Sequence, residues 1–191
     1  MSQSALAPVV FARHCEVTVI PAGHSLTIAQ GTEAVVTQAL GGRITLQIPA
    51  LGILVQLAAK DSDAIGIEAA APAAARHADG GAPVTRAALA PLVEGALKTC
   101  FDPEIPVNIV DLGLVYGIDL TEAPGGGWQV TVAMTLTAPG CGMGGVIAAD
   151  AREKILELPG VREAAVNVVW EPLWGPERIS SAGRAILGID A

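Results

Sequence analysis

The sequence predicts a small all-β domain followed by an α/β domain in which helices cover a small sheet in a two-layer α+β arrangement. Short segments rich in Val, Ile, Thr and Leu, separated by turn residues, fill residues 15–58. A tract of Ala, Pro and Gly at residues 69–85 lacks apolar periodicity and is typical of a linker. Beyond it, helical and strand-like patterns follow in the order α-β-β-α-β-α. We therefore expect a flexible leader at residues 1–12, the β-rich domain at 13–68 and the α/β domain at 86–191.

The composition of the chain argues against several classes of protein. Of the 191 residues 51% are apolar but only 3% are aromatic, so the core must consist mainly of Val, Ile, Leu and Ala. A net charge of −8 argues against nucleic-acid binding, because phosphates favour a basic face. The three cysteines contain no C-x-x-C pair, which argues against a disulfide framework and a self-sufficient zinc or four-cysteine site. No segment resembles a signal peptide or a membrane span, so we expect a cytoplasmic protein.

Five short strands joined by tight turns are expected in the first domain, as a small meander or barrel-like roll. They lie at residues 15–21, 25–30, 33–39, 43–49 and 52–58. His14 and Cys15 are neighbours in this pattern and should point to opposite faces, so neither they nor His24 indicate a metal site. Cys15 is expected in the core, and Asp61 and Asp63 are expected to cap a turn.

The second domain should contain two helices that cover the sheet, an antiparallel hairpin, a third strand and a short final helix that opens at Ser180. In chain order these elements lie at residues 90–100, 114–120, 128–137, 146–158, 161–170 and 179–187. Pro91 suits the first turn of the first helix. Cys100 falls on the apolar face of that helix and is expected to be packed rather than reactive.

The connection between the second strand and the second helix contains a cysteine among glycines. Cys141 is expected near unpaired N–H groups and the positive end of the helix dipole, both of which favour a thiolate. Thr135 and Thr137 alternate along the strand and should present their hydroxyls on one face near this thiol. We expect a supporting loop around the thiol, made of Thr135, Thr137, Gly140, Gly142 and Met143.

Two interpretations of this connection meet contrary evidence in the sequence. The glycines match G-x-G-x-x-G, but the preceding strand belongs to a hairpin and the domain is too small for two mononucleotide-binding halves. No histidine follows residue 80, so the domain holds no Cys-His nucleophilic pair. A thiol that binds a metal or handles a cluster is the interpretation that remains.

An acidic loop precedes the hairpin. Asp102, Glu104 and Asp111 lie within ten positions, and Pro103 and Pro106 stiffen the segment. Composition alone favours a solvated surface loop whose acids cap turns. From residue 86 onward the chain has seven basic and thirteen acidic residues, so a protein partner or a cation fits this domain better than a phosphate ligand.

Three long segments, in the same order, resemble signatures of the DUF59 (MIP-eighteen-like) family. They are DPEIPVNIVDLGLVY at residues 102–116, MTLTAPGC at 134–141 and VVWEPLW at 168–174. The first domain is similar to the extra domain of SufT-type members, through CEVTVIPAG at 15–23, VTQALGG at 36–42 and DSDAIG at 61–66. The glycine after Cys141 also fits SufT better than relatives that place proline there.

The resemblance implies a small α/β fold and a role in iron–sulfur protein maturation. It implies functional roles for Cys141, Thr135, Asp102 and Glu104, with Asp111 as a further candidate, and so reverses the passive interpretation of the acidic loop. The implied partners are SUF-type assembly proteins and apo iron–sulfur proteins. One cysteine cannot supply four thiolates, so a transient cluster or iron would need ligands from a second subunit of a homo-oligomer, a partner or a small thiol.

Three functions stay open at this point. The first is a non-catalytic maturation factor in which Cys141 binds or passes iron or a cluster, or docks a cluster carrier. The second is a metal-free adaptor in which Cys141 only shapes its loop. The third is a thiol-dependent enzyme or an accessory subunit for oxygenase maturation. Relatives of the oxygenase type end in a cysteine-rich extension, and no such extension precedes Ala191.

Overall fold

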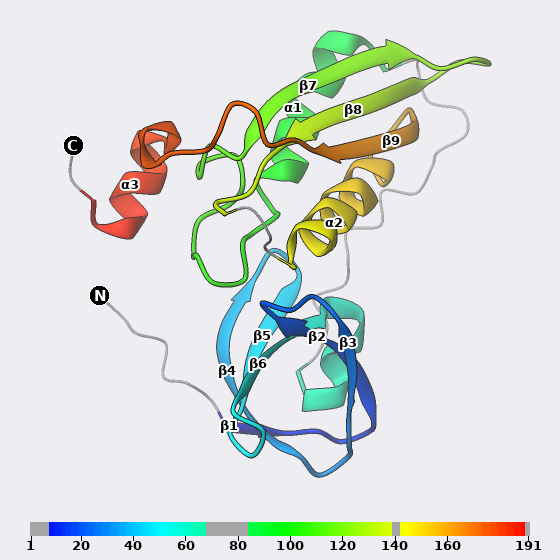
Figure 1. The fold of residues 1–191 in the computed structure, drawn as a ribbon. Helices are drawn as coiled ribbons and strands as arrows, with labels where there is room; N and C mark the ends of the chain where they lie inside the picture. Colours follow the sequence, from blue (N-terminus) through cyan, green and yellow to red (C-terminus); the bar gives the residue numbers. More distant parts are fainter. Residues whose placement is uncertain (1–7, 68–83, 139–141, 190–191) are drawn as a thin grey trace. The chain divides into compact units, whose positions relative to one another are not determined.

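A computed structural model describes residues 8–67, 84–138 and 142–189 (Figure 1). The chain divides into two compact units, Met1–Pro72 and Ala73–Ala191. The first is built on one antiparallel sheet, and the second combines a small sheet with helices in the expected order. This arrangement confirms the predicted fold class.

The first unit is a six-stranded sheet in which every pair of neighbours is antiparallel, with the strand order β1-β4-β5-β6-β2-β3. Its elements are β1 (Pro8–Val10), β2 (Cys15–Ile20), β3 (Ser25–Ile28), β4 (Glu33–Leu40), β5 (Arg43–Ile48), β6 (Ile53–Ala58) and the 3₁₀-helix η1 (Ala59–Ile65). The two central strands, β5 and β6, pair along their whole length, so the sheet is most regular at its centre. The five predicted strands are confirmed to within two residues at each end.

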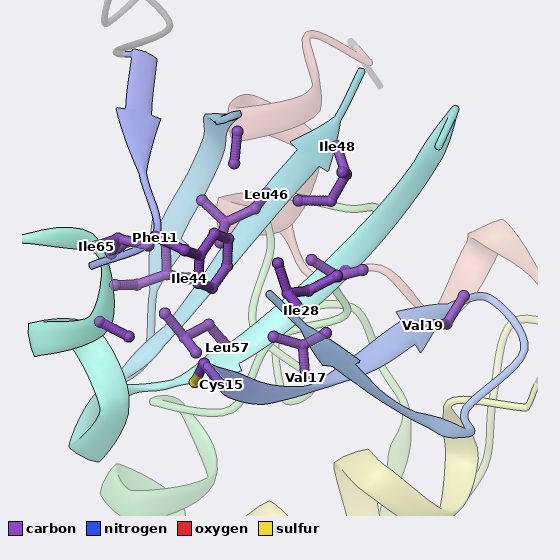
Figure 2. Close-up of a cluster of buried hydrophobic side chains, with 13 residues drawn as sticks. Phe11, Cys15, Val17, Val19, Ile28, Ile44, Leu46, Ile48, Leu57 and Ile65 are labelled. Atoms are coloured by element: carbon purple, nitrogen blue, oxygen red, sulfur yellow. The ribbon is translucent and has the colours of Figure 1, made fainter. Parts of the chain in front are cut away.

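Alternation along the strands places one set of apolar side chains in a common core (Figure 2). Leu46 of β5 and Leu57 of β6 are fully buried. Cys15 is only 3% exposed and belongs to the same cluster, which confirms its expected place in the core. His14 and His24 are exposed, so neither shares the environment of this thiol.

The structure differs from the expected flexible leader at residues 8–12. Pro8–Val10 form β1, which pairs with β4, and the Phe11 side chain is 1% exposed in the core. The N–H of Phe11 donates to the carbonyl of Thr32 at 3.0 Å, and that of Ala12 donates to Ala64 at 2.7 Å. A three-residue edge strand is too short to show a period, which is why the pattern did not predict it.

The two acids after β6, Asp61 and Asp63, form ion pairs and do not cap a turn as expected. Asp61 and Asp63 lie in η1, and both carboxylates contact the Arg13 guanidinium. Asp63 accepts two hydrogen bonds from Arg13 at 2.8 Å, a bidentate geometry, and Asp61 accepts a third at 3.0 Å. The two acids therefore hold the connection between β1 and β2, through Arg13, against η1.

The second unit has a three-stranded sheet in the order β7-β8-β9. Its elements are α1 (Arg86–Leu97), β7 (Val115–Glu122), β8 (Trp128–Met134), α2 (Gly144–Leu156), β9 (Val161–Val168), the 3₁₀-helix η2 (Pro176–Arg178) and α3 (Ser181–Leu187). The first two strands form the predicted antiparallel hairpin, and β9 returns parallel to β8 after α2. Within the described residues no helix is both long and apolar enough to cross a bilayer.

Helix α1 begins four residues earlier than expected. Thr85 is its N-cap, and the Thr85 hydroxyl accepts a hydrogen bond from the N–H of Ala88 at 3.3 Å. Pro91 therefore lies inside the helix and not in its first turn, so that part of the prediction is wrong. Cys100 follows the end of the helix and is fully buried, as expected.

Replacing Phe11 by alanine should lower the free energy of unfolding of the first unit by about 3–5 kcal/mol, because a buried aromatic ring leaves a cavity. The matched control is Val10→Ala at the preceding residue, the last of β1, where 53% of the residue is exposed and the loss should be about 1 kcal/mol or less. Urea titration followed by circular dichroism measures both. Equal losses would show that Phe11 does not contribute to the core as described.

Candidate functional site

The end of β8 is held between two segments that are distant in sequence. The N–H of Thr135 donates to the carbonyl of Leu114 at 2.8 Å, just before β7. The carbonyl of Met134 accepts from the N–H of Val169 at 2.8 Å, just after β9. Thr135 is 1% exposed, so this predicted site residue is buried. The chain thus leaves β8 from a fixed point.

The predicted thiol itself lies outside the described residues, with Pro139 and Gly140. The activated thiolate at Cys141 therefore stays a prediction from sequence. On the two sides of this gap, Thr137 is half-buried and Gly142 is exposed.

The start of α2 is packed tightly against the end of β8. Met143, a member of the predicted supporting loop, is the N-cap residue and is 1% exposed, so its side chain belongs to the core. Its side chain has no oxygen that could accept from the first N–H groups of the helix. A Cβ at Gly144 would overlap the Cδ1 methyl of Leu136, so a larger residue there would displace that buried side chain. Sequence reasoning did not identify this contact.

Two acids of the predicted acidic loop have different environments. Asp102 is 5% exposed, and its Oδ1 accepts a hydrogen bond from the N–H of Glu104 at 2.9 Å. Burial raises the pKa of Asp102, and the N–H groups of Glu104 and Ile105 offset part of that rise. Glu104 is exposed. The loop therefore combines one poorly solvated carboxylate with one that is available to a partner.

Asp111, the third acid, has both carboxylate oxygens engaged inside the unit. Oδ2 accepts from the Asn108 amide at 2.7 Å, and Oδ1 accepts from the Ser180 hydroxyl at 2.8 Å. These hydrogen bonds, with a smaller contribution from Lys98, hold the pKa of Asp111 below its usual value. Ser180 is also the N-cap of α3 and accepts from the N–H of Gly183 at 3.0 Å. Sequence reasoning placed Ser180 at the start of a helix but did not connect it with Asp111.

The segment after β9 packs on the end of the acidic loop. The indole N–H of Trp174 donates to the carbonyl of Leu112 at 2.9 Å, and the Tyr116 hydroxyl donates to the carbonyl of Pro172 at 2.8 Å. The Arg178 guanidinium lies 4.5 Å from the centre of the Tyr116 ring. Gly113 has φ +74°, and a Cβ there would overlap the backbone carbonyl of Arg178. The structure thus brings the first and third signature segments together.

Cys100 has the environment of an inert thiol. It is fully buried, and burial raises its pKa to about 12. The ammonium of Lys154 lies 2.9 Å from Asp150 and donates to the carbonyl of Thr99 at 2.7 Å. Among the described residues, no group of three His, Cys, Asp or Glu side chains is arranged to hold a metal ion.

Similarity to known proteins is concentrated in the second unit. The model of a family described as iron–sulfur cluster assembly protein matches residues 92–168. An Fe-S protein maturation auxiliary factor of Porphyromonas gingivalis is 41% identical over 92 residues, which are 48% of this chain and 84% of the relative. The auxiliary factor SufT of Staphylococcus aureus is 36% identical over 88 residues, which are 46% of this chain and 96% of the relative.

A solved structure shows the same partial coverage. The crystal structure of a DUF59 domain from Bacillus anthracis is 40% identical, covers 55% of this chain and 95% of that chain, and has a TM-score of 0.46. The family match does not include the first unit. The likeness of that unit to the extra domain of SufT-type proteins therefore stays a prediction.

Cys100 should react with iodoacetamide about 10³-fold more slowly in the native chain at about pH 8 than in the urea-unfolded chain. The reason is that its raised pKa of about 12 leaves little thiolate. Peptide mapping by mass spectrometry measures the rate for each cysteine separately. Similar rates in the two states would contradict the described burial of this thiol.

Replacing Asp102 by asparagine should raise the urea midpoint at about pH 7, because asparagine keeps the oxygen that accepts from Glu104 but carries no buried charge. A raised pKa means that the folded state binds the proton more tightly than the unfolded state. Ionisation of Asp102 therefore destabilises the fold as the pH rises from the pKa of the unfolded chain through that of the folded chain. The increase in urea midpoint from asparagine should shrink towards about pH 4, where the carboxyl is largely protonated in the folded state.

The matched control for this substitution is Glu104→Gln, at the exposed neighbour two positions along. It should leave the urea midpoint nearly unchanged at both pH values, since a solvated carboxylate gains little from neutralisation. A lower midpoint for Asp102→Asn at both pH values would show that the Asp102 charge stabilises the fold.

Proposed function

Because the chain belongs to the iron–sulfur cluster assembly protein family, we propose that it is an auxiliary factor in iron–sulfur protein maturation within a SUF-type system. One observation carries this proposal: two relatives named as such factors share 41% and 36% identity with this chain over 84% and 96% of their own lengths. The β8–α2 connection and the acidic loop are the parts of the chain that we assign to this function. We further propose that the chain assists transfer and is not itself an enzyme.

In this proposal Cys141 is the residue that meets the cargo. A thiolate is a soft ligand suited to iron and to iron–sulfur clusters. One cysteine leaves the remaining ligand positions to a partner, a second subunit or a small thiol, which suits a factor that passes its cargo on. Three contacts fix the ends of the connection: Thr135 with Leu114, Met134 with Val169, and Leu136 with Gly144.

The acidic loop supplies the second part of the proposed site. Glu104 is exposed and available to a basic group of an assembly protein or an apo iron–sulfur protein. Asp102 is buried at the cost of a raised pKa, and perturbed groups of this kind concentrate at functional sites. We propose that Asp102 shapes the loop that presents Glu104.

A metal-free adaptor is the second candidate. The observation in its favour is that both carboxylate oxygens of Asp111 are engaged by Asn108 and Ser180. That acid therefore serves the fold in the described structure and adds no open ligand to the site. In an adaptor Cys141 would only shape the loop, and the partners would meet on the protein surface.

Replacing Cys141 by serine separates the two candidates. The chain is purified without oxygen, offered iron and sulfide, and tested by visible absorption and by activation of an apo iron–sulfur protein. We expect Cys141→Ser to lose at least about tenfold in the activation rate, because the hydroxyl is a poor ligand for iron where a thiolate is a good one. The visible absorption of bound cargo should fall with it.

Cys15→Ala and Cys100→Ala are the matched controls, since each removes a thiol that is buried in a core. Both should keep the activation rate of the wild type at a temperature where the variants remain folded. If the wild type and Cys141→Ser activate the target equally and neither holds iron, the adaptor replaces the proposed cargo-binding role.

A further inference from the structure

We propose that Asp111 is a positioning residue. It joins the acidic loop to the C-terminal segment, which runs from Val169 after β9 to Ser180 at the start of α3. It thereby fixes the end of β8, which precedes the cysteine loop. The inference rests on the proposed function, because it assigns a role within the same site. It also gives a specific role to Asp111, which the family resemblance indicates as a further candidate among the acidic-loop residues.

The carboxylate of Asp111 is the centre of a hydrogen-bonded junction. Its two oxygens accept from donors on opposite sides: the Asn108 amide at 2.7 Å within the loop, and the Ser180 hydroxyl at 2.8 Å from a residue 69 positions away. Hydrogen bonds to an ionised acceptor are roughly twice as strong as neutral ones. The Asn108 side-chain oxygen accepts from the N–H groups of Val110 and Asp111, so the loop is also closed on itself.

The backbone repeats the connection that the carboxylate makes. The carbonyl of Asp111 accepts from the N–H of Ser180 at 2.8 Å. A Cβ at Gly183 would lie 2.7 Å from that same carbonyl oxygen and 2.8 Å from a methyl of Ile179, so only glycine allows α3 to approach this closely. Ser180 is thus placed to cap α3 and to bind Asp111 with one hydroxyl.

Each segment joined by Asp111 also holds the end of β8. On the loop side, Leu114 lies three residues after Asp111 and accepts from the N–H of Thr135. On the C-terminal side, Val169 begins the segment that reaches Ser180, and its N–H donates to the carbonyl of Met134. The β8 end therefore lies between these two segments, and Asp111 is the charged side chain that joins them, beside the neutral hydrogen bonds of Trp174 and Tyr116.

The first experiment uses hydrogen exchange of individual amides in the full chain. Ser180→Ala removes the hydroxyl that Asp111 accepts from, and Asp111→Asn removes the charge. Both should speed exchange of the Thr135 and Val169 amides by about tenfold or more relative to the amide of Val132, in the middle of β8. A loss of global stability alone would speed all three amides together, so the ratio reports the local connection.

Two variants serve as matched controls. Ser180→Thr keeps a hydroxyl that both caps α3 and donates to Asp111, so it should restore the exchange ratio of the wild type. Asp119→Asn removes a carboxylate whose side chain is 68% exposed and whose Arg86 partner is 3.9 Å away, so it should change nothing. If Ser180→Ala and Asp111→Asn leave the exchange ratio at the wild-type value, the proposal is wrong.

The second experiment measures activation of an apo iron–sulfur protein by the same variants where they are folded. Ser180→Ala should lower the rate at least about threefold, and Ser180→Thr should not, because only the former releases the β8 end. A raised exchange ratio without a change in activation would overturn the positioning role. A failure of the proposed function looks different: Cys141→Ser would then match the wild type, while the exchange ratio would still report whether Asp111 fixes the end of β8.

Discussion

The arrangement of the second unit depends on the contacts that hold the end of β8 between the segment before β7 and the segment after β9. Helices α1 and α2 supply fully buried side chains such as Leu89, Val93 and Ile155, and backbone hydrogen bonds of Met134 and Thr135 hold the end of β8. The carboxylate of Asp111 adds a charged junction nearby, where it accepts from Asn108 in the acidic loop and from Ser180 after β9. Such a junction is directional, whereas apolar packing is not, so it can fix one orientation of the segments that meet there.

Asp102 and Asp111 belong to one loop, but their pKa values are shifted in opposite directions. Burial raises the pKa of Asp102, and hydrogen bonds from side chains lower that of Asp111. By linkage, the lowered pKa of Asp111 adds stability above the pKa of the unfolded chain, and this is lost as the pH falls through the folded value. The raised pKa of Asp102 works against the fold at neutral pH. One acid therefore serves the structure, while the other is retained against its effect on stability, as is common at functional sites.

The fold was largely predictable because its elements carry a period. Alternation predicted the strands from Cys15 onward and the core place of that thiol, and the helical period predicted α1 and α2. The three-residue strand β1 has no period and was missed, and the start of α1 was displaced because its cap Thr85 precedes the apolar pattern. The signature segments indicated Asp111 as a site residue, but its hydrogen bond to Ser180 spans 69 positions and leaves no local pattern. The same holds for Leu136 and Gly144, which meet only once β8 and α2 are in place.

The contact between Leu136 and Gly144 also limits the combined size of two side chains. The pair fills one volume, with the large residue on the strand side and the absent side chain on the helix side. An alanine at position 144 would therefore be best tolerated with a smaller residue than leucine at position 136, and each change alone would be harmful. Among relatives of this chain, a larger residue at position 144 should therefore occur together with a smaller residue at position 136.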